Sequence, residues 1–165
     1  MTHISLILAL CFFVGMAIVK YPPNLVWLGG TGTQVGDVAA GVAIVPGMLI
    51  ERYNSSGIPL FRPCTIVTAL GVSPTFALNQ SMVNQGINVP YAIGDLVEAL
   101  IADNGATVWG LVATAAPAIV IGDKLESAGD GTMRKWTTGT PIALALEPLT
   151  NISGSNARLR LEVIT

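Results

Sequence analysis

The chain has 165 residues, of which 52% are hydrophobic and only 11% are charged. This length suits one domain with a sizeable core, and the charged fraction is well below the roughly one quarter that is usual for a soluble domain. Eight Lys and Arg residues against ten Asp and Glu residues give a net charge of −2, and no basic stretch could neutralise a phosphate backbone, which argues against nucleic acid as a partner. One histidine, His3, and two cysteines, Cys11 and Cys64, argue against most histidine- and cysteine-dependent chemistry.

Residues 1–20 form a hydrophobic N-terminal segment, and the stretch 4–19 within it carries no charge. A helix over these 16 residues would span about 24 Å, which is short of the roughly 30 Å hydrocarbon core of a membrane. The segment is consistent with a secretory signal or a membrane anchor, and equally with an apolar arm that packs against another subunit. A further alternative is that translation begins at Met16.

Residues 21–41 open with two prolines and contain five glycines, a composition that predicts an extended arm followed by loops. Within this arm, four adjacent apolar residues need a surface to cover them. Such a segment can add to a sheet edge of a partner protein with Trp27 as the anchor, or it can form an edge strand of its own barrel with Trp27 in the core. The candidate protein-binding residues are Tyr21, Leu25, Val26, Trp27 and Leu28.

Residues 42–165 consist of short aliphatic and β-branched runs separated by Gly, Asn, Asp and Pro, with turns about every ten residues, which is typical of a sandwich or barrel. Alternation in the last run predicts that Arg158, Arg160 and Glu162 lie on a solvent-exposed face. Three antiparallel pairs are predicted: 97–114 around the turn Asp103-Asn104-Gly105, 124–136 around Gly129-Asp130-Gly131, and 141–146 with 157–163.

One short motif occurs three times, at residues 44–51, 91–98 and 119–126, and we call it the turn motif. Each copy has an apolar approach, a glycine and a glutamate four residues after the glycine, and two copies have an aspartate directly after the glycine. Glycine permits turn conformations that other residues avoid, and aspartate can bond the following backbone amides. The turn motif is therefore interpreted as a device that starts a strand, with Glu51, Glu98 and Glu126 at solvated positions.

The residues that could carry chemistry favour structural roles. Asp95, Asp103, Asp123 and Asp130 could converge on a metal ion, but aspartate beside glycine is ordinary turn chemistry and no calcium-loop pattern is present. A hydrolytic triad lacks a histidine in this domain, and no serine stands in a Gly-x-Ser-x-Gly elbow. Cys64 is expected to be a buried thiol. We expect no enzymatic activity, no metal and no cofactor.

A series of short segments gives the clearest sign of family. They are Ala-Gly-Val-Ala-Ile-Val-Pro-Gly at 40–47, Tyr-Ala-Ile-Gly-Asp at 91–95, Gly-Asp-Lys-Leu-Glu-Ser at 122–127, Ala-Leu-Ala-Leu-Glu at 143–147 and Arg-Leu-Arg-Leu-Glu-Val-Ile at 158–164. In this order they resemble the capsid decoration, or cement, proteins of tailed bacteriophages. The apolar stretch 4–19 is not part of that pattern.

The resemblance implies an all-β chain with a small β-barrel or β-tulip-like decoration domain over 42–165 and an extended N-terminal arm over 21–41. It also implies a structural virion protein on the outer surface of the capsid. Its partners would be the major capsid protein and its own copies, in a homotrimer that cements the shell. The alternative, which the apolar residues 1–20 favour, is a secreted or membrane-anchored β-domain.

Overall fold

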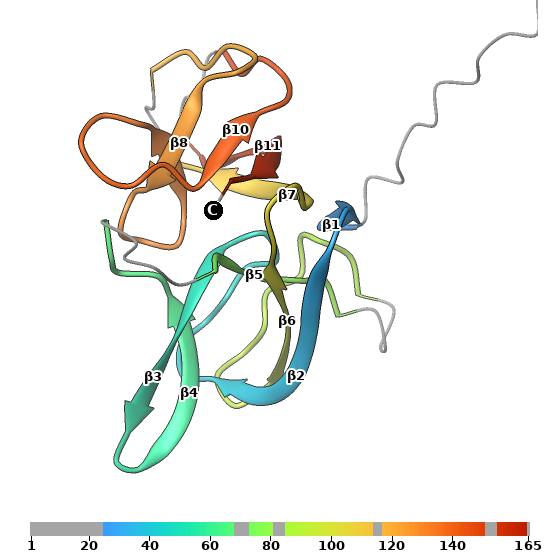
Figure 1. Cartoon of the computed structure of the whole chain (residues 1–165). Helices are drawn as coiled ribbons and strands as arrows, with labels where there is room; N and C mark the ends of the chain where they lie inside the picture. Colours follow the sequence, from blue (N-terminus) through green and yellow to red (C-terminus); the bar gives the residue numbers. More distant parts are fainter. Residues whose placement is uncertain (1–24, 68–72, 81–84, 114–116, 151–154, 165) are drawn as a thin grey trace, which may run out of the picture.

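The structure, a computed structural model, describes residues 25–67, 73–80, 85–113, 117–150 and 155–164. These residues contain eleven β-strands and no α-helix, which confirms the all-β prediction. Figure 1 shows two groups of strands, one above the other, with most of the first half of the chain in one group and the second half in the other. Each group contains a closed ring of five strands, and we call these rings barrel 1 and barrel 2.

Barrel 1 is built from β2 (Gly32–Ala40), β3 (Leu49–Ser55), β4 (Ile58–Pro63), β5 (Thr75–Ala77) and β6 (Leu96–Ala102). The strands follow the order β2-β4-β3-β5-β6, and the parallel pairing of β2 with β4 closes the ring. The other four pairings are antiparallel. A compact apolar cluster that includes Val38, Ile50, Phe61 and Ala99 fills the interior, because alternate residues of each strand point inward.

Barrel 2 is built from β7 (Thr107–Val112), β8 (Lys124–Ser127), β9 (Met133–Lys135), β10 (Ala143–Ala145) and β11 (Ala157–Val163). The strands follow the order β7-β11-β10-β8-β9, and a parallel pairing of Val112 with Met133 closes the ring. The short strand β1 (Trp27–Gly29) pairs with the first half of β7 and extends this sheet.

The two barrels repeat one topology. In each, the first strand pairs antiparallel with the fifth and parallel with the third, the second pairs with the third and the fourth, and the fourth pairs with the fifth. The approach to each second strand is also repeated, because Ile44 bridges Tyr91 in barrel 1 as Ile119 bridges Leu149 in barrel 2. The single barrel domain predicted for 42–165 is therefore replaced by two barrels, and the first of them begins at β2.

The segment 25–41 differs from the arm and loops that the glycines of 21–41 predict. It forms β1 and β2, and β2 pairs with β6 from Gly32 to Ala39. The pairing register shifts between Val35 and Val38, so Gly36 lies at an irregularity of the strand, where a glycine is well tolerated. Residues 1–20 and the beginning of the predicted arm lie outside the described residues.

The hairpin predicted over 97–114 is wrong, although its turn exists. Ala106 N donates to Asp103 O (3.1 Å), so the four residues from Asp103 form a tight turn. Gly105 has positive φ (84°) and Asn104 does not, whereas a hairpin of the expected type needs positive φ at both central residues. The flanking strands therefore diverge, β6 into barrel 1 and β7 into barrel 2.

The other two predicted antiparallel pairs are confirmed, as β8 with β9 and β10 with β11. A further hairpin, which the sequence did not reveal, joins β3 to β4. Its two central residues, Ser56 (φ 53°) and Gly57 (φ 87°), both have the positive φ that the two-residue hairpin turn requires.

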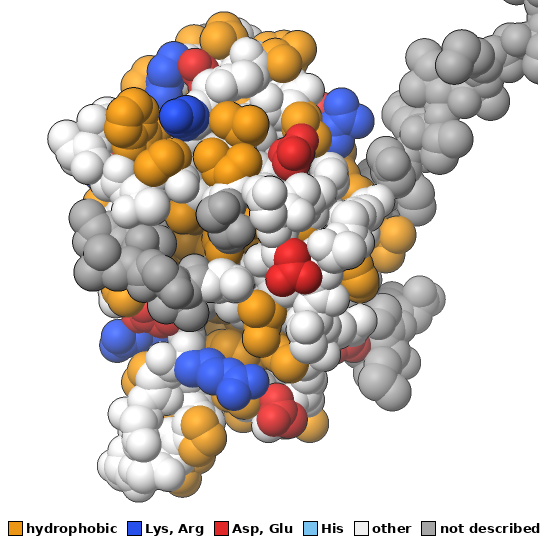
Figure 2. Space-filling model, viewed as in Figure 1, with side chains coloured by type: hydrophobic (Ala, Val, Ile, Leu, Met, Phe, Trp, Pro, Cys, Tyr) orange, Lys and Arg blue, Asp and Glu red, His pale blue; other side chains and the backbone are white. Residues whose placement is uncertain are grey.

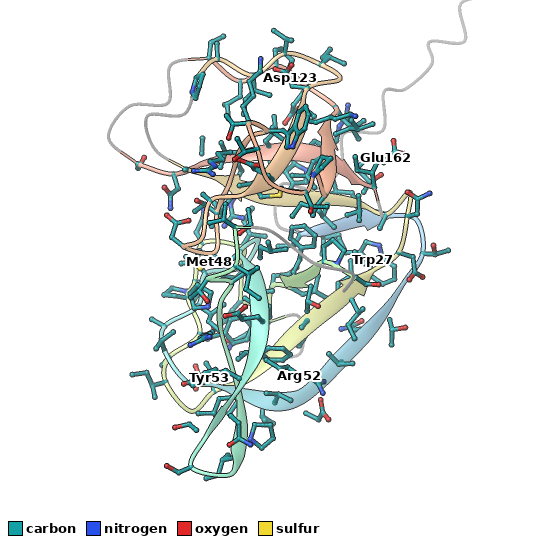
Figure 3. All side chains as sticks on the ribbon, turned by 60° about the vertical axis from the view of Figure 1, so that its left-hand side comes forward. Trp27, Met48, Arg52, Tyr53, Asp123 and Glu162 are labelled. Carbon is teal, nitrogen blue, oxygen red and sulfur yellow. The ribbon has the colours of Figure 1, made fainter. Side chains whose placement is uncertain are left out.

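Barrel 1 and barrel 2 share an apolar core, to which barrel 1 contributes Leu49, Phe76 and Leu100. Backbone hydrogen bonds cross the junction: Leu111 N to Gly47 O (3.0 Å), Leu49 N to Gly131 O (2.8 Å) and Gly131 N to Cys64 O (3.1 Å). Figure 3 shows Met48 near this junction, with Asp123 toward one end of the molecule and Tyr53 toward the other.

Arg158 on β11 is a second link between the barrels. Its Nη1 donates to Pro46 O (2.8 Å) and its Nη2 donates to Ile87 O. Burial lowers the pKa of this guanidinium, because the charged form loses contact with water. The exposed face predicted for β11 is therefore wrong at Arg158, which is partly covered by barrel 1.

Candidate functional site

The predicted protein-binding residues lie in or beside β1, except Tyr21, which lies outside the described residues. Val26 and Leu28 are buried in the core of their own chain, whereas Leu25 is 40% exposed. Trp27 is partly buried, and its Nε1 donates to Gly29 O (2.9 Å). The segment thus forms an edge strand of its own chain, as one of the two hypotheses predicted. That hypothesis placed Trp27 in the core, whereas Val26 and Leu28 fill it.

We expect Trp27→Ala to lower the free energy of unfolding by about 2 kcal/mol, roughly half the loss typical of a fully buried aromatic side chain. Leu25→Ala is the control, because a substitution at an exposed position usually changes stability by less than about 0.5 kcal/mol. Denaturant unfolding of both variants measures this. Equal stability of the two variants would contradict the packing seen for Trp27.

The three copies of the turn motif share one local geometry. The glycines have positive φ, 89° at Gly47, 91° at Gly94 and 85° at Gly122. Asp95 Oδ2 accepts a hydrogen bond from Ala92 N (2.7 Å), and Asp123 Oδ2 accepts one from Val120 N (2.9 Å). The aspartates therefore close the turn through the amide three residues earlier, whereas the sequence predicted that they bond the amides that follow.

The prediction that the motif glutamates are solvated is wrong for Glu126, because its side chain is completely buried. It accepts hydrogen bonds from Arg134 Nε (2.9 Å), Thr137 Oγ1 (2.8 Å) and Gly139 N (2.6 Å). Burial alone would raise the pKa of this carboxyl, but the hydrogen bonds from Thr137, Gly139 and Arg134 outweigh it, and the pKa lies below its usual value.

Glu51 makes the equivalent arrangement in barrel 1, with bonds from Arg62 Nε (2.8 Å) and Thr65 Oγ1 (2.8 Å). Its side chain is 14% exposed, so it too is mostly buried. Burial again acts to raise the pKa, and the bonds from Thr65 and Arg62 lower it below its usual value. The third glutamate, Glu98, is half-buried and accepts a bond from Gln34 Nε2 (3.4 Å).

The two carboxylate clusters occupy matching places, and we call them the Glu-Arg-Thr clamps. Glu51 is directly opposite Arg62 in the pairing of β3 with β4, as Glu126 is opposite Arg134 in the pairing of β8 with β9. The sequence signal that could have revealed them is an Arg-x-x-Thr segment after two of the three turn motifs, at 62–65 and 134–137. Because a salt bridge of this kind fixes the register of a strand pair, the clamps are structural elements.

Cys64 is buried, as predicted, and burial raises the pKa of its thiol. The four aspartates considered as metal ligands lie in four different turns; Asp130 Oδ1, for example, accepts a bond from Thr132 N (2.9 Å). In the part of the chain that the structure describes, no three His, Cys, Asp or Glu residues are grouped so that they could hold a metal ion.

Large apolar side chains are exposed at several places on the surface, and Figure 2 shows orange patches between sparse charged groups on one face. Two of the three turn motifs carry the most exposed of them, Ile93 (74%) and Ile121 (66%), each directly before the glycine. Leu96 (63%) and Val120 (56%) lie beside them. The others are Leu25, Val42, Ile58, Ile66, Val89 and Trp136. Exposed apolar residues that are gathered at particular turns are typical of interaction sites.

A comparison with protein-family models and with curated proteins finds no match for this chain. The described part of the chain contains no helix that is long and apolar enough to cross a membrane.

Proposed function

We propose that this chain is a structural virion protein that binds the outer surface of a phage head and cements neighbouring copies of the major capsid protein. The observation that carries the proposal is a charge-poor, all-β body whose large apolar residues are exposed at turns of both barrels. Such surfaces need a protein partner. The ordered segments from 40 to 164 that resemble decoration proteins support the same proposal.

The proposal includes association of the chain with itself as a homotrimer, and it assigns the chain no catalytic activity and no cofactor. Each barrel is held by a Glu-Arg-Thr clamp, and the two barrels share core residues, a construction that favours rigidity. A rigid body with several apolar contact points suits a subunit that must bridge neighbours on a shell.

Binding to heads tests this function. Heads assembled from the major capsid protein encoded with this chain, and stripped of the chain, are mixed with the full-length protein and sedimented. We expect the protein to sediment with the heads up to a fixed stoichiometry, and to raise the temperature at which the heads fall apart. Heads already saturated with the protein are the control. Failure to sediment at any concentration would contradict the function and favour the secreted or membrane-anchored alternative.

A further inference from the structure

The two barrels contact each other through different faces. The contact surface of barrel 1 lies around Gly47, Leu49 and Cys64, and the contact surface of barrel 2 lies around Leu111, Gly131 and Arg158. We call the first surface the A face and the second the B face. Because the junction joins an A face to a B face, each barrel keeps one face that the junction does not use.

The residues that form the A face of barrel 2 can be identified from the strand register, because the two barrels share one topology. Leu49 and Phe76 are paired in barrel 1 as Lys124 and Leu144 are in barrel 2. Pro46, Gly47, Leu49 and Cys64 of barrel 1 correspond to Ile121, Gly122, Lys124 and Trp136 of barrel 2. The barrel 1 residues of this set are buried, whereas their barrel 2 counterparts are exposed, Ile121 at 66% and Trp136 at 44%.

The residues that form the B face of barrel 1 are identified from the strand register in the same way. Leu96 is paired with Ala39 as Arg158 is paired with Leu111. Leu96 therefore takes the place of Arg158, and it is 63% exposed. The nearby residues Ile93 and Val42 are exposed apolar residues as well, at 74% and 41%. The chain thus carries an exposed A face on barrel 2, apolar at Ile121 and Trp136 and charged at Lys124, and an exposed apolar B face on barrel 1.

We propose that the open A face of one copy docks on the open B face of the next, so that the chain associates head to tail through a contact built like its own internal junction. Inside the chain Arg158 contacts Pro46. The corresponding residues between copies are Leu96 and Ile121, which would meet as an apolar pair. A contact of this type joins different surfaces, so it closes into a ring or continues as a filament.

Charged residues lie in or beside both open faces, where they can orient one copy of the chain relative to the next. Lys124 lies within the open A face, with its ammonium 5.6 Å from the centroid of the Trp136 ring. Glu162 lies on the other side of Leu144 in the strand register, toward the border of that face. Asp37 and Arg52 form an exposed ion pair (3.5 Å) on β2 and β3, beside the open B face. Opposite charges at the border of a contact select the orientation of the partner more than they add affinity. The inference deepens the self-association within the proposed function, but it does not need the capsid.

Two variants that each remove one face test the docking. Ile121→Glu places a charge in the open A face, and Leu96→Glu places one in the open B face. Thr33→Glu is the control, because Thr33 is exposed and lies at the other end of β2 from Ala39, the residue paired with Leu96. Sedimentation over a concentration series measures the self-association, and circular dichroism verifies that every variant is folded. We expect the unchanged chain and Thr33→Glu to associate alike, and each face variant to associate at least about tenfold more weakly.

Mixing the two face variants gives the decisive result. Each variant retains the face that the other has lost, so a head-to-tail contact predicts one-to-one dimers in the mixture and monomers in the separate solutions. A Leu96→Cys chain mixed with an Ile121→Cys chain is also expected to form a disulfide between the two chains. A mixture that stays monomeric, an unchanged chain that is monomeric at all concentrations, or weakening by Thr33→Glu alone would overturn the proposal. Head binding is measured separately, so it can succeed or fail independently.

Discussion

Glu126→Gln is expected to lower the free energy of unfolding by about 3 kcal/mol, because it removes the charge of a fully buried carboxylate and leaves a donor of Arg134, Thr137 or Gly139 poorly matched. Glu51→Gln is the matched control in barrel 1. The partners Arg62 and Arg134 are exposed alike, at 41% and 38%, but the Glu51 side chain is 14% exposed whereas that of Glu126 is fully buried. Water can therefore replace part of the lost interaction at Glu51, and we expect a loss of only about 1 kcal/mol. Urea unfolding of the two variants measures both values, and equal losses would contradict the difference in burial.

The same carboxyl gives a pH dependence of defined sign. The pKa of Glu126 in the folded protein lies below its usual value of 4.5, so the contribution of its charged form is complete above pH 4.5 and is lost as the pH falls through the folded pKa. The stability difference between the unchanged chain and Glu126→Gln should therefore be constant near neutral pH and shrink below pH 4.5. A difference that grows on acidification would show that the hydrogen bonds do not stabilise the charged form.

Gly47→Ala is expected to have an effect of similar size at the junction of the barrels. A Cβ atom at Gly47 would lie 2.5 Å from Arg158 Nη1 and 2.7 Å from Trp109 O, and φ is +89°. Forcing the barrels apart and straining the backbone should together lower the free energy of unfolding by about 3–5 kcal/mol.

Gly122→Ala is the matched control, since Gly122 occupies the equivalent place in barrel 2. It has nearly the same φ (+85°), but nothing lies within 4 Å of the position of its Cβ. Only the cost of the backbone conformation remains there, about 1–2 kcal/mol. Thermal unfolding of both variants gives the comparison, and a control that loses as much as Gly47→Ala would show that the junction is not tightly packed.

The all-β class and two of the strand pairs could be predicted because they depend on local patterns. Alternation in 157–163 and the glycine turn at 129–131 are such patterns, and both lead to the observed pairs. The turn at Asp103 was also predictable, but the partner of each flanking strand was not. That partner depends on whether Asn104 adopts positive φ, and on the two cores that compete for β6 and β7.

Burial of charged residues was the main feature that the sequence concealed. A glutamate in an alternating strand is predicted to be solvated. Glu126 is buried only because β9 brings Arg134 to it and the following loop brings Thr137 and Gly139. The repeat of the barrels was concealed for a similar reason. The turn motif marks equivalent positions at 44–51 and 119–126, but its third copy at 91–98 and the unequal strand lengths obscure the pairing.

An electron cryo-microscopy reconstruction of heads incubated with the full-length chain tests the proposed function most directly. We predict density for the two-barrel body on the outer surface, bridging capsid subunits in clusters of three, with barrel 2 of each copy against barrel 1 of the next. Heads whose outer surface shows no such density at saturating protein, or density confined to the interior, would contradict the assignment as a decoration protein.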